Sequence, residues 1–370
     1  MAATIENLFG EAVLESFRQP TEVRTGLPGA AYADETFLAL ENQKLFPERW
    51  TFVGFAHQIS NPGDVQPATV AGRPIVMVRN QLGDINVFHN VCRHRCLKLV
   101  DEAINVGHFI QCPYHTWTYS LDGELKSTPH FGGYGKHQPD NFDMSTHGLV
   151  PVRAHCWGDW IFVNLDGNAE AFESYAAPLM ARLEGVDVDS LVALASIDFG
   201  EIDTNWKFLM ENFMEPYHVQ YVHPSTTEQP LGDHRTIVDG LCLGSLVDLP
   251  DEQTDAASLA VSSRYLTLFP NFVVGRYFPD QLGVYLNIPV SAGKTRQVRV
   301  IYSTGEREFS DEEVKQVRDL WYSVHKEDHS ICERLQAGRA SQVALEGGRL
   351  SPVWEDSVRR FQELIVDAVS

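Results

Sequence analysis

The chain has 370 residues, of which 44% are hydrophobic and 21% charged, and its net charge is −21. This length allows a large core and favours two domains, and the composition is typical of globular proteins. The negative charge argues against nucleic acid as a partner, because phosphate would be repelled. The N-terminal stretch lacks the features of a signal peptide, and no stretch offers the roughly 20 apolar residues of a membrane span. We therefore expect a cytoplasmic protein with no membrane partner.

The first predicted element is an amphipathic helix over residues 34–46, and a β-rich region then extends to about residue 166. In this region, residues 73–79 and 85–91 form the first predicted hairpin. Further strands are predicted at 117–121, 124–126 and 160–165. The apolar face of the helix consists of Phe37, Leu38, Leu40, Leu45 and Phe46.

The second half of the chain returns to helix and then to sheet. Residues 168–194 are predicted as a helix with a connector, and residues 265–303 as strands. Ser310 and Glu313 form a capping box that starts a long C-terminal helix. The aromatic residues of the strands have three candidate roles: a cation–π cage for a methylated ammonium, an apolar slot for an arene, or core packing. They are Phe269, Phe272, Tyr277, Phe278 and Tyr285.

Two short Cys/His pairs lie beside the predicted hairpins. Cys92 and His94 follow the first hairpin, and Cys112 and His115 precede the second. Two thiolates and two imidazoles are the ligand set of a Rieske [2Fe–2S] cluster, in which both thiolates bind one iron and both imidazoles bind the other. The imidazoles raise the reduction potential of the cluster. Structural zinc usually takes C-x₂₋₄-C and H-x₃₋₅-H pairs, so the C-x-H spacing argues against zinc. We therefore predict that these four residues bind a Rieske cluster in an antiparallel β-domain.

The other four cysteines show no disulfide framework, because they are spread over a long chain. We expect them to be small, buried and reduced. They are Cys96, Cys156, Cys242 and Cys332.

His218 and His223 lie five residues apart at the end of a predicted helix, with Pro224 just beyond. Two imidazoles and one carboxylate form the facial triad of non-haem Fe(II) oxygenases, which leaves open positions for O₂. Two histidines at this spacing are more often unrelated, but the upstream Cys/His pairs favour a second metal site here.

With these motifs the chain resembles the oxygenase (α) component of Rieske non-haem iron oxygenases, the ring-hydroxylating dioxygenase superfamily, over nearly its whole length. The resemblance rests on the two Cys/His pairs, on Asn205-Trp206-Lys207, and on N-x-x-D/E-x-x-H-x₄-H at residues 212–223. It implies an α+β fold with an antiparallel β Rieske domain at residues 45–166. Residues 1–44 and 167–370 would form a helix-grip catalytic domain, an antiparallel sheet with helices, that holds a mononuclear Fe(II).

The resemblance also implies roles for single residues. His218 and His223 would bind the mononuclear iron. Glu215 would link this iron to His115 of a neighbouring subunit in a homotrimer, and Asn212 would belong to the catalytic residues. The third ligand would be a carboxylate on the C-terminal helix, with Glu327, Asp328 and Glu333 as candidates. We choose Asp328, because the family's Asp typically precedes an I-x-E-x-x-Q-like run, which Ile331, Glu333 and Gln336 match in shape.

The implied function is that of a terminal oxygenase that uses O₂ and electrons from NAD(P)H. A partner reductase, with or without a ferredoxin, would deliver the electrons. Glu215 stands where Asp is commoner and resembles the subgroup that oxidises quaternary amines such as carnitine, glycine betaine and stachydrine, although those enzymes have Cys at the position of Pro216. We expect monooxygenation and N-demethylation of a small methylated or quaternary amine.

Three alternatives remain open from the sequence. The first is an aromatic ring-hydroxylating oxygenase of aromatic hydrocarbon catabolism. The second is a Rieske electron carrier, which would hold no iron outside the cluster and would leave the second half of the chain without a role. The third is a zinc-dependent binding module, which would be colourless.

Overall fold

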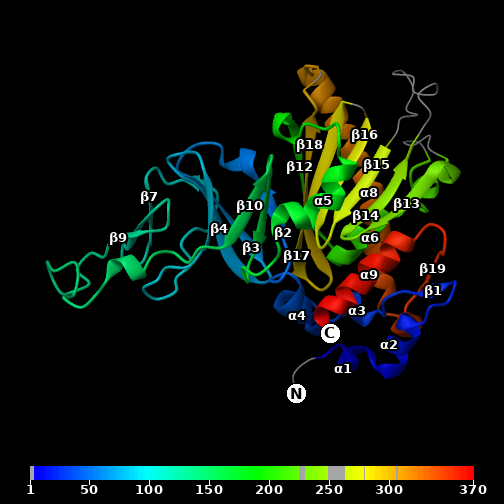
Figure 1. The fold of residues 1–370 in the computed structure, drawn as a ribbon, viewed down its shortest axis with the longest axis horizontal. Helices are drawn as coiled ribbons and strands as arrows, with labels where there is room; N and C mark the ends of the chain where they lie inside the picture. Colours follow the sequence, from blue (N-terminus) through cyan, green and yellow to red (C-terminus); the bar gives the residue numbers. More distant parts are fainter. Residues whose placement is uncertain (1–3, 225–229, 249–262, 279, 306) are drawn as a thin grey trace. The chain divides into compact units, whose positions relative to one another are not determined.

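The computed structural model describes residues 4–224, 230–248, 263–278, 280–305 and 307–370 (Figure 1). Two compact units make up the chain. The β unit is Phe46–Ala169, and the α+β unit combines Met1–Leu45 with Glu170–Ser370. In the described part of the chain, all paired strands run antiparallel. The predicted fold class, an antiparallel β-domain with an α+β domain, is thereby confirmed.

The β unit contains three small sheets. The first has the order β10 (Arg153–Trp157), β11 (Trp160–Asn164) and β2 (Thr51–Phe55). The second has the order β5 (Ile85–His89), β4 (Arg73–Arg79), β3 (Asp64–Val70) and β6 (Ile104–Asn105). The third has the order β7 (Phe109–Gln111), β8 (Thr118–Ser120) and β9 (Leu125–Ser127). The predicted hairpins are β4–β5 and β8–β9.

Local side-chain chemistry fixes the turns of both hairpins. Asn80 Oδ1 accepts hydrogen bonds from the backbone N–H groups of Leu82 and Asp84, at 3.0 and 2.8 Å, and so closes the β4–β5 turn. Gly123, in the β8–β9 turn, has φ +84°, and a Cβ there would lie 2.5 Å from the Phe88 ring. This position therefore requires glycine, for backbone conformation and for space.

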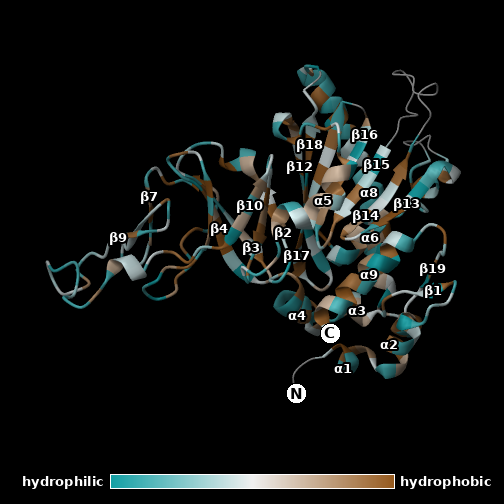
Figure 2. Ribbon diagram, viewed as in Figure 1, coloured by the Kyte–Doolittle hydropathy of each residue, from teal (hydrophilic) through white to brown (hydrophobic). Residues whose placement is uncertain are grey.

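The α+β unit is built on a seven-stranded sheet with the order β12, β18, β17, β16, β15, β14, β13. Helices α6, α8 and α9 contact strands of this sheet. Figure 2 shows α9 with hydrophobic and hydrophilic segments in alternation, as expected of an amphipathic helix that covers a sheet. The strands are β12 (Val192–Ile202), β13 (His234–Asp239), β14 (Cys242–Val247), β15 (Ser263–Leu268), β16 (Phe272–Phe278), β17 (Gln281–Ser291) and β18 (Lys294–Ser303). A separate pair joins β1 (Arg24–Thr25) to β19 (Arg349–Leu350).

Nine α-helices are described: α1 (Ile5–Phe9), α2 (Glu11–Arg18), α3 (Ala30–Ala33), α4 (Glu35–Leu40), α5 (Phe172–Arg182), α6 (Trp206–Met214), α7 (Val219–Val222), α8 (Asp311–Gly338) and α9 (Asp356–Val369). Helix α4 and the π-helical turn Glu41–Leu45 that follows it account for the helix predicted over 34–46, and its predicted apolar face is buried. No helix in the described ranges is both long and apolar enough to cross a bilayer.

Helix α8 begins at the predicted capping box. Ser310 Oγ accepts a hydrogen bond from the Glu313 backbone N–H, and the Glu313 carboxylate accepts one from the Ser310 backbone. One face of the middle of the helix is buried, at positions three and four residues apart. This face consists of Trp321, His325, His329 and Cys332. The register of the buried face decides which carboxylates of α8 can turn inward.

Helix α6 is held by a buried ion pair. Lys207 Nζ lies 2.6 Å from Glu41 Oε1, and both side chains are fully buried. Trp206 Nε1 donates a second hydrogen bond to the same carboxylate, at 3.1 Å. The pair therefore joins the start of α6 to the π-helical turn after α4. A pair of this kind is strongly destabilising to break, because the remaining partner stays buried and charged.

We expect Lys207→Met to lower the free energy of unfolding by about 3–5 kcal/mol, because Glu41 would keep a buried charge without a partner. Lys294→Met is the matched control, since Lys294 pairs with Glu201 and Asp203 at the surface. Differential scanning calorimetry should show a large fall in melting temperature for the first variant and little change for the second. Equal shifts in the two variants would contradict a structural role for the buried pair.

Candidate metal centres

The two Cys/His loops of the β unit have the same backbone pattern. In each loop, the cysteine N–H donates to the carbonyl five residues on, at 2.8 Å, and its carbonyl accepts from the N–H four residues on, at 3.0 Å. The residue four positions after the cysteine has φ +57° in both loops. The two loops are therefore a repeated turn, each of which places a buried thiol beside a half-buried imidazole. The donors and acceptors are Cys92, Cys96 and Leu97 in one loop and Cys112, Thr116 and Trp117 in the other.

Cys96 occupies the left-handed position of its loop. Glycine adopts this conformation freely, whereas a residue with a Cβ loses on the order of 1 kcal/mol there. This explains why a small residue suits the position. Cys96 is exposed, as is Cys156, so the prediction that they are buried was wrong, whereas Cys242 and Cys332 are buried as expected.

The imidazoles of the two loops face each other. The ring centroids of His94 and His115 are 4.6 Å apart, and the His94 ring stacks on Trp117 at 4.9 Å. Within the described residues, His115 Nδ1 is buried and has no hydrogen-bond partner.

The two cysteines of the loops, Cys92 and Cys112, lie in the hydrophobic core, and burial raises the pKa of Cys92. Tyr119 packs in the same core, with its hydroxyl 3.3 Å from Cys92 Sγ. A desolvated thiol pair and an imidazole nitrogen without a partner fit a metal cluster that supplies positive charge to both.

The second centre lies where helix α6 ends. Glu215 has an extended backbone and terminates α6, and Pro216 follows it. His218 and His223 then flank the short helix α7 as its N-cap and C-cap. The expectation that both histidines lie at the end of a single helix was therefore wrong. On a continuous helix, residues five apart point about 140° from each other, whereas caps outside the helix can converge.

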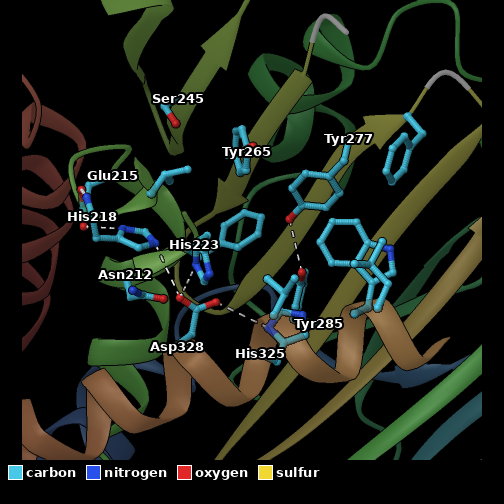
Figure 3. A pocket seen from close by; sticks show the side chains of 16 residues that line it. Asn212, Glu215, His218, His223, Ser245, Tyr265, Tyr277, Tyr285, His325 and Asp328 are labelled. Atoms are coloured by element: carbon cyan, nitrogen blue, oxygen red, sulfur yellow. Dashed lines mark hydrogen bonds and ion pairs between the residues drawn. The ribbon is translucent and has the colours of Figure 1, made fainter. Parts of the chain in front are cut away.

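Asp328 of helix α8 lies against both histidines (Figure 3). Its Oδ1 is 2.9 Å from His223 Nε2 and 3.6 Å from His218 Nε2. One ligand atom from each of the three residues lies within 4.8 Å of the others. Of the other candidates for the third ligand, Glu327 binds the far nitrogen of His223, and Glu333 is exposed. The geometry thus favours Asp328.

Two carboxylates hold the histidines in position. Glu215 Oε1 is 2.7 Å from His218 Nδ1, and Glu327 Oε2 is 2.7 Å from His223 Nδ1. In each case the carboxylate fixes the tautomer, so that Nε2 faces Asp328. The second oxygen of Glu215 accepts hydrogen bonds from the backbone N–H groups of Tyr217 and His218. Glu215 is thus rigidly held beside the histidine that it supports.

The charges at this centre favour a bound cation. Burial works against a charge on His218, but Glu215, through its charge and its hydrogen bond, outweighs burial and raises the pKa of the imidazole. Burial opposes a charge on His223 as well, and the hydrogen bond to Asp328 and the charge of Asp328 outweigh it. A pair of imidazoles and a carboxylate in such surroundings fits a mononuclear Fe(II) with open coordination positions.

Two residues near this centre were missed by the sequence analysis. Arg299 Nη1 donates to His325 Nε2 at 2.5 Å, and His325 Nδ1 lies 3.8 Å from Asp328 Oδ2. Burial, followed by the charge of Arg299, lowers the pKa of His325 well below its ordinary value. His325 thus lies beside Asp328 as a neutral imidazole. The sequence did offer one signal for His325, which is its position three residues before Asp328 on the same predicted helix.

A pocket opens beside the triad. Asn212 lines it from helix α6, and no side-chain hydrogen bond of Asn212 is found among the described residues. Tyr277, Phe278 and Tyr285 also line the pocket, whereas Phe269 and Phe272 are core residues elsewhere. The remaining lining residues are Phe213, Glu215, His218, Val219, His223, Ser245, Tyr265, Leu320, Trp321, Val324, His325 and Asp328.

We expect Asp328→Asn to lose the mononuclear iron and to keep the red-brown absorption of the cluster, because the cluster candidates lie in the other unit and an amide is a weak ligand. Glu333→Gln makes the same chemical change at an exposed position of α8 and should keep all the iron. In each variant, iron analysis measures the total iron, and a visible absorption spectrum measures the cluster. Equal iron in the two variants would remove Asp328 from the ligand set.

Comparison with known proteins agrees with both centres. The family model for the ring-hydroxylating alpha subunit (catalytic domain) matches residues 180–370, and that for the Rieske [2Fe–2S] domain matches residues 49–138. The glycine betaine monooxygenase oxygenase subunit of Chromohalobacter salexigens is 35% identical over 198 residues, which is 54% of this chain and 43% of that protein. The match thus spans less than half of that relative's length.

Two further proteins match over nearly the whole chain. The carnitine monooxygenase oxygenase subunit of Acinetobacter baumannii is 27% identical over 379 residues, covering 96% of this chain and 98% of that protein. The crystal structure of the quaternary ammonium Rieske monooxygenase CntA, in complex with an inhibitor, superposes with a TM-score of 0.82 at 23% identity, covering 96% and 98% of the two chains, and shows a shared fold. Since the catalytic-domain model matches more than half of its residues, the chain belongs to the ring-hydroxylating alpha subunit family and carries a Rieske [2Fe–2S] domain in its first half.

Proposed function

We propose that this chain is the terminal oxygenase component of a Rieske-type oxygenase system, acting as a cytoplasmic homotrimer. It would use O₂ and electrons from NAD(P)H, delivered by a partner reductase with or without a ferredoxin, for monooxygenation and N-demethylation of a small methylated or quaternary amine. The observation that carries the proposal is the convergence of His218, His223 and Asp328 at one end of an aromatic pocket.

The two proposed domains would hold different metal centres. The proposed Rieske domain is residues 45–166, in which the cluster ligands would be Cys92, His94, Cys112 and His115. The proposed catalytic domain is residues 1–44 and 167–370, in which the triad would hold a mononuclear Fe(II). When bound, the cluster supplies single electrons and the mononuclear iron supplies the coordination positions at which O₂ is activated.

Glu215 and Asn212 complete the proposed catalytic residues. Glu215 holds His218 Nδ1 at 2.7 Å, and we propose that it also connects to His115 of a neighbouring subunit. The catalytic path would then run through a subunit interface, which requires a closed ring. Asn212 lines the pocket close to the triad, where its amide can orient substrate or water (Figure 3).

The choice of an amine substrate rests on Glu215 and on the relatives. The relatives named above are oxygenase subunits of glycine betaine and carnitine monooxygenases. Hydroxylation of an N-methyl carbon gives a carbinolamine, which separates into formaldehyde and the demethylated amine. The aromatic side chains that line the pocket would surround such a methyl group beside the triad.

Aromatic ring hydroxylation is the second candidate, and one observation favours it. Three rings that could enclose a methylated ammonium, those of Tyr277, Tyr285 and Trp321, already contact the guanidinium of Arg299. Rings such as Phe213 and Phe278 would then form a slot for an arene. In that case the enzyme would belong to aromatic hydrocarbon catabolism.

A single-turnover reaction tests the proposal without the natural reductase. Chemically reduced protein is exposed to O₂ with a mixture of methylated amines and arenes, and products are identified by mass spectrometry. We expect loss of one methyl group from an amine, with an equal amount of formaldehyde. Addition of oxygen to an arene, without demethylation, would contradict the amine assignment and support the second candidate.

Glu215→Gln is the informative variant in the same experiment. We expect it to retain both metals, because Glu215 is not among the proposed metal ligands, and to lose turnover, because the carboxylate behind His218 is replaced by a neutral amide. Glu333→Gln, an exposed carboxylate of α8, should react as the unmodified enzyme does. Normal turnover by Glu215→Gln would show that Glu215 does not connect the two centres.

A further inference from the structure

Arg299 of strand β18 is a cation in the core of the α+β unit. Its side chain is fully buried, and within the described residues it forms no ion pair. Two of its donor nitrogens, Nε and Nη2, have no hydrogen-bond partner there. A guanidinium stays charged at neutral pH, and burial of an unpaired charge is costly. The position therefore calls for a functional explanation.

Three aromatic rings surround the guanidinium of Arg299. The guanidinium carbon lies 3.9 Å from the ring centroid of Trp321, 4.8 Å from that of Tyr285 and 5.6 Å from that of Tyr277. Gly283 of the adjacent strand leaves the necessary space, since a Cβ there would lie 2.5 Å from Arg299 Nη2. Aromatic faces offset part of the cost of the buried charge.

Arg299 acts on the pocket through a tyrosine. Its Nη1 donates to the Tyr285 hydroxyl at 2.6 Å, and the Tyr285 and Tyr277 hydroxyls are 3.2 Å apart. Both tyrosines line the pocket (Figure 3). Because Tyr285 accepts a hydrogen bond from a cation, its own O–H becomes a stronger donor. The tyrosine pair is thus prepared to donate to an acceptor in the pocket.

The two ends of the pocket differ in charge. Glu215 and Asp328 are the only carboxylates among the described lining residues, and both lie at the triad. Figure 3 shows the Tyr277–Tyr285 pair apart from Glu215 and His218, on the other side of Asp328. With Arg299 behind it, the tyrosine pair forms the positive end. A ligand with a negative group would be oriented by this difference.

We propose that the Tyr277–Tyr285 pair binds a carboxylate of the substrate and that Arg299, acting through Tyr285, supplies the compensating charge. The inference rests on the proposed function, because it takes this pocket as the substrate site, and it deepens that function by naming the substrate class. A methylated amine would then be a zwitterion, with its carboxylate at the tyrosines and an N-methyl group toward the triad. Substrates of similar size that lack a carboxylate would bind less well.

Equilibrium binding to the holoenzyme tests this with matched probes. Glycine betaine is compared with choline, and salicylate with salicylamide, by isothermal titration calorimetry. We expect at least one carboxylate to bind about tenfold or more tightly than its partner, as for a hydrogen bond to a charged group. If neither carboxylate binds more tightly than its partner, the proposal is wrong.

Variants then assign the selectivity to these residues. Tyr285→Phe and Arg299→Gln should bring the ratio of affinities close to one, and Arg299→Lys should restore part of it, because the charge is kept. Tyr322→Phe is the control, since it removes a half-exposed hydroxyl outside the lining residues. Unchanged selectivity in Tyr285→Phe, which keeps the ring and the packing, would overturn the proposal even where Arg299→Gln does not fold.

The same probes separate this inference from the proposed function. Preference for salicylate over salicylamide, with neither amine bound nor oxidised, would support the carboxylate site and reject the amine substrate. Equal binding and equal demethylation of glycine betaine and choline would support the amine oxygenase and reject the carboxylate site.

Discussion

The contact of Asp328 with the Nε2 atoms of His218 and His223 is the constraint on which the catalytic unit depends. The three residues come from α7 and α8, which are about a hundred residues apart in the chain, so the tertiary fold must bring them together. The buried face of α8 sets the rotation of that helix, and the end of α6 at Glu215 frees the next residues to turn back. Carboxylates behind each imidazole then orient the nitrogens toward Asp328.

Two buried cations of the same unit show different uses of charge. Lys207 is paired with Glu41, so its charge is compensated inside the protein, and the pair fixes the start of α6. Arg299 lacks a carboxylate partner in the described part and is surrounded by rings and by a neutral histidine. The first arrangement stabilises the fold without reference to a ligand. The second arrangement is explained if a negative group binds in the pocket, because Arg299 donates a hydrogen bond to Tyr285 and Tyr285 lines that pocket.

The features that were predictable from the sequence depend on short stretches of chain. The hairpins, the capping box of α8 and the two Cys/His loops each follow from a few adjacent residues. The continuous helix expected at His218 and His223 was wrong, because Glu215 and Pro216 interrupt it between α6 and α7. Arg299 could not be found in this way, since its role arises from the register of β18 against β17 and α8.

The tertiary structure gives different positions to candidate residues of the same chemical type. Of the five aromatic residues singled out in the sequence, three line the pocket and two are buried in the core. The pocket residues are Tyr277, Phe278 and Tyr285, and the core residues are Phe269 and Phe272. Adjacent carboxylates of α8 also make different contacts: Asp328 lies at the Nε2 atoms of both histidines, while Glu327 contacts Nδ1 of His223. The run after Asp328 had already favoured it as the ligand, but the supporting position of Glu327 depends on the rotation of α8 and could not be read from the sequence.

We infer that one chain holds a Rieske cluster in the β unit and a separate iron in the α+β unit. This can be measured as the ratio of iron to acid-labile sulfide in the purified, iron-loaded protein, with ⁵⁷Fe Mössbauer spectra to separate the iron sites. We expect a ratio of about three to two, with one ferrous site distinct from the cluster. Equal iron and sulfide, with no iron outside the cluster, would contradict it and leave an electron carrier in its place.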